Sequence, residues 1–123
     1  MELALRQVGQ NLVISFVGRV NLEGDTSVEF KDRLKGLIAD GNAHVIVDLG
    51  NVGFLDSQGL GALISCLKVL RQTEGSFVLT NLSEPVEAVL RITRLIRVFD
   101  IATTVEDALR MLGRQPAAAA RGA

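Results

Sequence analysis

The chain has 123 residues, 48% of them hydrophobic and 22% charged, enough for one domain with a single core. Its net charge of −1, with both signs interspersed, and its lack of tryptophan and tyrosine argue against binding of nucleic acid or of a charged membrane surface. No apolar run is long enough to span a bilayer, and the amino terminus lacks a signal-peptide pattern, so we expect a cytoplasmic protein.

The first predicted element is a β-hairpin. Residues 3–8 and 12–17 are rich in apolar side chains and are separated by residues 9–11, which include a glycine. A three-residue connection with glycine is typical of two antiparallel strands. The glycine-bounded stretch of residues 18–24 is then predicted to form turns.

An amphipathic helix is predicted next, ending near Gly41, which is a good stop signal. Asp25 or Thr26 can cap its start, because a side-chain oxygen there can accept a hydrogen bond from a free backbone N–H group. The expected apolar face of this helix consists of Val28, Leu34, Leu37 and Ile38, with Phe30 left unassigned.

A buried strand and a second helix form the centre of the predicted fold. Residues 44–49 are β-branched and apolar, the pattern of a strand that is buried on both faces. A helix over residues 57–74, closed by Gly75, is predicted from apolar residues at helical spacing: Leu60, Leu63, Ile64, Leu67 and Leu70. Cys66 lies in the middle of this helix and is interpreted as a small core residue. The five phenylalanines mostly fall in apolar runs and are expected in the core.

The last third of the chain begins with a strand over residues 76–82 and a helix that Ser83 can cap, with Pro85 in its first turn. Three arginines follow at three-residue spacing: Arg91, Arg94 and Arg97. They could bind phosphate, but we interpret them as a solvent-exposed face of the helix and its exit.

The type of the short apolar run at residues 98–101 is left open. Either Thr103 with Glu106 or Thr104 with Asp107 makes a capping box for a last helix.

A hairpin followed by alternating helices and strands predicts an α/β fold with a mixed β-sheet. We expect one domain over residues 1–113, followed by a disordered tail over residues 114–123, which is rich in alanine and has no apolar face.

The sequence contains no recognisable catalytic constellation. A nucleophile elbow at Ser57 fails because Leu55 stands at its first glycine position. The only histidine, His44, starts a strand whose length places it about 16 Å from Ser57, at about 3.3 Å per residue. A dinucleotide fingerprint starting at Gly59 fails at Ile64, and one histidine with one cysteine gives no metal site. We therefore expect neither an enzyme nor a cofactor.

The candidate functional element is the start of the helix at residue 57. Asp56 and Ser57 stand where this helix needs its cap. Gly59 and Gly61 follow in its first turns, where each costs about 0.5–1 kcal/mol relative to alanine. Such a start suggests that something approaches the backbone closely. An ordinary helix cap remains the simpler interpretation of Asp56 and Ser57.

The stretch from Val45 to Gly61, VIVDLGNVGFLDSQGLG, closely resembles the STAS domains of bacterial anti-sigma factor antagonists. Further matches occur in the ranges Gly18–Leu22, Leu79–Leu82 and Val89–Phe99, so the likeness covers roughly residues 11–112. It implies a single STAS-like domain, a mixed sheet with an amino-terminal antiparallel hairpin and about four helices mostly on one side.

The resemblance also implies a mechanism. In this family the serine after the aspartate is phosphorylated by a partner that is both anti-sigma factor and ATP-dependent serine kinase. The unphosphorylated protein binds that partner and frees the sigma factor, and a PP2C-type phosphatase resets it. Carried onto this chain, the phosphoacceptor is Ser57, and the partner-binding residues are Asp56, Ser57, Gln58, Gly59 and Gly61. Many relatives have serine or threonine where this chain has Gln58.

Two other interpretations remain open. The chain could be a STAS adaptor in a transport or stress-sensing complex, with Ser57 serving only as a cap. Alternatively, the chain could be an unrelated small α/β enzyme, although no catalytic constellation supports this interpretation.

Overall fold

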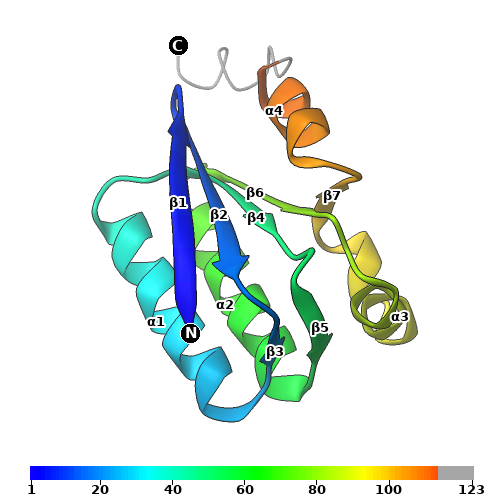
Figure 1. The fold of residues 1–123 in the computed structure, drawn as a ribbon. Coiled ribbons are helices and arrows are strands. Elements are labelled where there is room, and N and C mark those ends of the chain that lie inside the picture. Colours follow the sequence, from blue (N-terminus) through cyan, green and yellow to red (C-terminus); the bar gives the residue numbers. More distant parts are fainter. Residues whose placement is uncertain (114–123) are drawn as a thin grey trace.

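The computed structural model of the protein describes residues 1–113, and its elements follow the predicted order (Figure 1). The strands are β1 (Glu2–Val8), β2 (Asn11–Val17), β3 (Val20–Leu22), β4 (His44–Asp48), β5 (Val52–Leu55), β6 (Ser76–Thr80) and β7 (Asp100–Ala102). The helices are α1 (Gly24–Ala39), α2 (Ser57–Gln72), α3 (Glu84–Ile92), the 3₁₀ turn η1 (Leu95–Arg97) and α4 (Val105–Gly113). The predicted disordered tail, residues 114–123, lies outside the described residues.

Five strands form a mixed sheet in the order β1-β2-β4-β6-β7. β1 and β2 are antiparallel, and the other neighbouring pairs are parallel. Val8 pairs with Asn11, so the turn has two residues and not the three that the sequence suggested. Gly9 in this turn has a φ of +60°, a conformation that glycine adopts at little cost. The predicted mixed sheet with an amino-terminal hairpin is confirmed.

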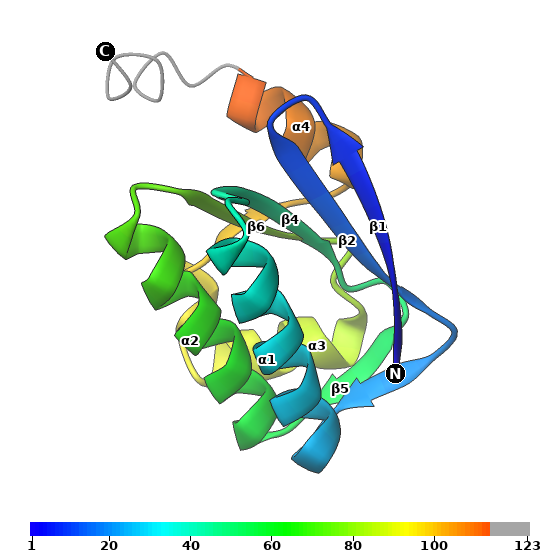
Figure 2. The same ribbon diagram turned by 90° about the vertical axis from the view of Figure 1, so that its left-hand side faces the viewer.

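Helices cover the two faces of this sheet unequally. α1 and α2 lie side by side over one face, and α4 covers part of the opposite face (Figure 2). Successive side chains of β4 point to opposite faces of the sheet. Val45 and Val47 belong to the larger core cluster, and Ile46 belongs to the smaller one. All three side chains are fully buried, as predicted for a strand covered on both faces. Within residues 1–113, no helix is both long and apolar enough to cross a bilayer.

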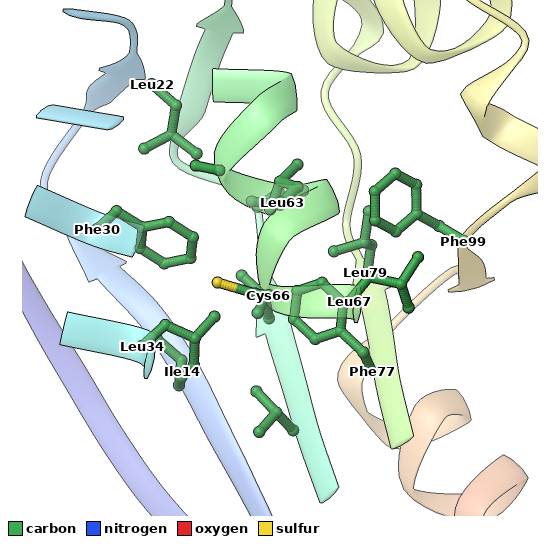
Figure 3. Packing of buried hydrophobic residues seen from close by; sticks show 14 of the residues in the cluster. Ile14, Leu22, Phe30, Leu34, Leu63, Cys66, Leu67, Phe77, Leu79 and Phe99 are labelled. Carbon is green, nitrogen blue, oxygen red and sulfur yellow. The ribbon is translucent and has the colours of Figure 1, made fainter. Parts of the chain in front are cut away.

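The larger core cluster lies between the sheet and the helices α1 and α2, and Cys66 is part of it (Figure 3). Its side chain is fully buried near Phe30 and Leu34, which confirms its interpretation as a core residue. Burial raises the pKa of the Cys66 thiol to about 11, although the positive charges of Lys35 and Lys31 offset part of this effect.

We expect the Cys66 thiol to resist alkylation by iodoacetamide in the folded protein at pH 8 and to react once urea unfolds the chain, because only the exposed thiolate is nucleophilic. The unfolded thiol loses its proton near pH 9 and the folded one near pH 11, so the free energy of unfolding should fall as the pH rises through this range. Comparison with Cys66→Val isolates this contribution. Fast labelling of the folded protein would contradict the burial of this side chain.

The start and the buried face of α1 differ from the prediction. The helix begins at Gly24, so neither Asp25 nor Thr26 is its cap, and the N-cap residue Glu23 makes no side-chain capping bond. Phe30 is fully buried, whereas Val28 is 44% exposed and was wrongly placed in the core. The predicted cap thus lies two or three residues too late in the chain. The sequence pattern alone does not fix which face of a short amphipathic helix meets the sheet.

The caps of α3 and α4 were predicted at nearly the right residues. Ser83 occupies the N-cap of α3, but its hydroxyl donates to the carbonyl of Val52 at 2.8 Å and does not cap the helix. This bond ties α3 to β5. In α4 the hydroxyl of Thr104 accepts from the backbone N–H of Asp107 at 3.1 Å, so the second of the two predicted boxes supplies the cap.

Two short strands escaped the sequence analysis. β3 lies in the stretch that was predicted to form turns, and β5 lies in the loop before α2. They pair with each other in parallel, with Leu22 opposite Leu55, and form a separate two-stranded sheet. Strands of three or four residues beside glycines carry no periodic pattern, so only their pairing reveals them. The apolar run at residues 98–101 begins directly after η1 and overlaps the first two residues of β7.

Candidate functional site

The candidate site lies where α1 and α2 begin, beside β3 and β5 (Figure 1). α1 starts two residues after the end of β3, and α2 starts two residues after the end of β5. Because these two strands are parallel neighbours, the two helices begin side by side. Each helix start carries unpaired N–H groups and the positive end of the helix dipole, so the site combines two such ends.

Asp56 connects these two helix starts. Its Oδ1 atom accepts from the backbone N–H of Gly59 at 2.9 Å and caps α2, as predicted. Its Oδ2 atom accepts a longer bond, 3.4 Å, from the backbone N–H of Gly24 at the start of α1. The backbone N–H of Asp56 donates to the carbonyl of Leu22 at 3.2 Å. One residue therefore fixes α2, α1 and the end of β3 relative to one another.

We expect Asp56→Ala to lower the free energy of unfolding by about 1–2 kcal/mol, because it removes the cap of α2 and the second contact at Gly24. Asp56→Asn keeps the capping oxygen but loses the second carboxylate acceptor. It should therefore lower the free energy of unfolding by only a few tenths of a kcal/mol. Urea unfolding followed by circular dichroism measures both. Equal losses for the two variants would show that the cap at Gly59 contributes nothing.

Ser57 is the first residue of α2 and is exposed to solvent. Its hydroxyl makes no hydrogen bond to any other part of residues 1–113, whereas the capping role belongs to Asp56. The simpler interpretation, an ordinary helix cap, therefore holds for Asp56 and not for Ser57. The arrangement presents a free hydroxyl at the positive end of a helix, where a modifying enzyme can reach it.

The two glycines of this helix start differ in their surroundings. Gly59 is buried, and a Cβ atom there would lie 2.2 Å from the carbonyl oxygen of Leu22 and 2.8 Å from the Cβ of Leu55. The close approach that the sequence suggested is thus real, but it comes from the chain's own backbone. Gly61 is exposed, and a Cβ atom there would meet nothing within 4 Å. Gly61, together with the exposed Gln58, leaves this surface open.

Comparison with known proteins identifies the fold that carries this site. The family model of the STAS domain matches residues 2–108. The chain belongs to the STAS domain family. BtrV of Bordetella bronchiseptica, a candidate anti-sigma factor antagonist, is 29% identical over 108 residues, which cover 88% of this chain and 91% of that protein. The anti-sigma-B factor antagonist of Bacillus subtilis is 34% identical over 87 residues, covering 68% and 71% of the two chains.

A solved structure agrees with this assignment. The crystal structure of a candidate anti-sigma factor antagonist from Thermotoga maritima superimposes with a TM-score of 0.84 at 25% sequence identity, over 91% of this chain and 95% of that one. The fold predicted from the resemblance is therefore confirmed for this STAS domain.

One exposed residue near the site of this STAS domain was missed by the sequence analysis. Phe54 was assigned to the core with the other phenylalanines, but it is 42% exposed. It lies two residues before Asp56, opposite Asn21 in the β3–β5 pair. An exposed aromatic side chain beside a functional site is a typical anchor for a protein partner. No pattern in so short a strand could have shown which way this side chain points.

Proposed function

We propose that this STAS domain is an anti-sigma factor antagonist switched by phosphorylation of Ser57. In its unphosphorylated form it binds an anti-sigma factor that is also a serine kinase, and the bound sigma factor is released. Phosphorylation ends this binding, and a PP2C-type phosphatase restores it. The names of the two similar bacterial proteins support the antagonist role. The observation that carries the switch is the exposed hydroxyl of Ser57, whose place as helix cap is taken by Asp56.

The effect of the phosphoryl group follows from its charge. It adds about −1.5 to −2 charges at pH 7. Within the free protein this charge lies at a positive helix start, so the fold tolerates it. Asp56, however, is the residue immediately before Ser57, and its carboxylate adds a second negative charge to this helix start. A partner covering this surface would have to remove water from both groups, which weakens binding.

The test uses the full chain as bait in an extract of its own bacterium, followed by purification of the anti-sigma factor that it captures. Incubation of the two purified proteins with ATP and Mg²⁺ should place one phosphate on Ser57, located by mass spectrometry, and should dissociate the complex. Ser57→Ala should remain bound and unmodified. Binding that persists in ATP, with no phosphate on Ser57, would favour a non-switching adaptor in place of this proposal.

Gly61→Ala tests whether the exposed glycine belongs to the partner surface. The added methyl group meets nothing within the described chain, so the free energy of unfolding should rise by up to about 1 kcal/mol. We expect binding to the captured anti-sigma factor to weaken about threefold to tenfold, or about 0.7–1.4 kcal/mol, measured by calorimetry. Gly36→Ala is the matched control, because Gly36 is also an exposed, open glycine but lies far along α1. Unchanged affinity for Gly61→Ala would remove this residue from the interface.

A further inference from the structure

A groove of about 370 Å³ lies between α1 and α2, next to the candidate site. α1 contributes Ser27 and Lys31 to its lining, and α2 contributes Gln58, Gly61 and Ser65. Gly61 and Ser65 follow Ser57 at intervals of four residues, so all three lie along one face of α2. The groove therefore continues from the surface that Ser57 occupies.

The polar side chains of this groove can all donate hydrogen bonds, and Lys31 among them can only donate. The hydroxyl of Ser27 is buried, with the residue only 2% exposed, and it has no hydrogen-bond partner in the described chain. A buried hydroxyl in this state destabilises the protein, since it has lost its contact with water and gained nothing in return.

Among the described residues that line the groove, Lys31 is the only charged one. Its ammonium group makes no ion pair within residues 1–113, and its side chain is half-buried. The hydroxyl of Ser65 and the amide of Gln58 can donate further hydrogen bonds. Within residues 1–113, none of the residues that line the groove is acidic.

We propose that this groove receives an aspartate or glutamate side chain of the bound anti-sigma factor. The proposal rests on the proposed function and names one contact of the same interface. The carboxylate would form an ion pair with Lys31 and accept a hydrogen bond from Ser27. A carboxylate is the protein side chain that fits best, because it is an acceptor only and carries the opposite charge. A lysine or arginine would be repelled by Lys31, and an apolar side chain would leave the Ser27 hydroxyl unpaired.

The contact between the partner's carboxylate and Lys31 would explain how phosphorylation of Ser57 weakens binding. A phosphoryl group on Ser57 lies on the same face of α2 as the groove and brings a second negative charge towards it. The incoming carboxylate would then be repelled at the point where it must lose water. Phosphorylation weakens binding in this scheme without a change of fold.

The experiment measures binding of the purified anti-sigma factor to the full chain by calorimetry at low and moderate salt. Lys31→Gln should bind about tenfold more weakly than wild type and lose most of the salt dependence. Lys35→Gln is the control, because Lys35 lies one turn further along α1 and does not line the groove. Ser27→Ala should raise the melting temperature of the free protein and still weaken binding severalfold. A purely structural role for Ser27 would not move these two quantities in opposite directions.

A charge exchange completes the test. Lys31→Glu should abolish binding, and replacing one acidic interface residue of the anti-sigma factor by lysine should restore it. If wild type, Lys31→Gln and Lys35→Gln all bind the anti-sigma factor equally tightly, the groove proposal is wrong. The phosphorylation switch is not affected by that result. If the unphosphorylated wild-type chain binds no anti-sigma factor, the proposed function itself fails, and this proposal with it.

Discussion

Gly59→Ala is expected to lower the free energy of unfolding by about 3 kcal/mol or more, the largest effect of any single methyl group at this site. The new Cβ atom would lie 2.2 Å from the carbonyl oxygen of Leu22, a distance that non-bonded atoms cannot adopt. That carbonyl cannot simply move away, because it accepts the backbone bond from Asp56 and belongs to the β3–β5 pair. Relief of the clash must therefore displace either the start of α2 or the end of β3.

Urea unfolding of purified Gly59→Ala and wild type measures this loss, and Gly61→Ala provides the matched control two residues away. Both substitutions add one methyl group to the first turns of the same helix, but only Gly59 has a backbone atom in the way. If Gly59→Ala fails to fold, Gly59→Ala carried with a stabilising Gly36→Ala keeps the comparison measurable. A difference from wild type of less than about 0.5 kcal/mol would contradict the close packing of α2 on β3.

Phosphorylation of Ser57 is expected to have the largest effect on binding. Ser57→Asp should weaken binding of the anti-sigma factor by at least about tenfold, or about 1.4 kcal/mol, through like-charge repulsion and unpaired desolvation. The phosphorylated protein should bind more weakly still, since a phosphoryl group carries more charge than a carboxylate. Ser57→Ala should bind like wild type, because the hydroxyl makes no bond within residues 1–113 that alanine would lose. Melting temperatures should barely change, because negative charge suits a helix start.

A binding titration of wild type, both variants and the phosphorylated protein measures these differences. Gln10→Asp is the control for added charge, because it places the same carboxylate in the hairpin turn, at the opposite end of the sheet from the site (Figure 1). If Gln10→Asp weakened binding as much as Ser57→Asp, the effect would come from the net charge of the protein and not from the position of the charge at residue 57. Tight binding by the protein phosphorylated at Ser57 would refute the switch.

The sequence by itself determined those parts of this STAS domain that depend on short-range patterns. The apolar run of β4 indicated burial on both faces, because its side chains alternate between the two layers. The cap of α2 by Asp56 also follows from local chemistry, since the carboxylate and the N–H group of Gly59 are only three residues apart. The same local chemistry placed Ser57 at the start of α2, whereas its role as phosphoacceptor was implied by the resemblance to STAS domains.

Only the tertiary structure decided how these parts meet. The start of α1 is held by Asp56, 32 residues away, and not by a cap of its own. The need for glycine at position 59 comes from the carbonyl of Leu22. The burial of Ser27 beside α2 and the exposure of Phe54 likewise depend on how neighbouring elements pack. Such contacts leave no periodic signal in the sequence, because each joins segments whose separation along the chain is set by the fold and not by the repeat of a helix or strand.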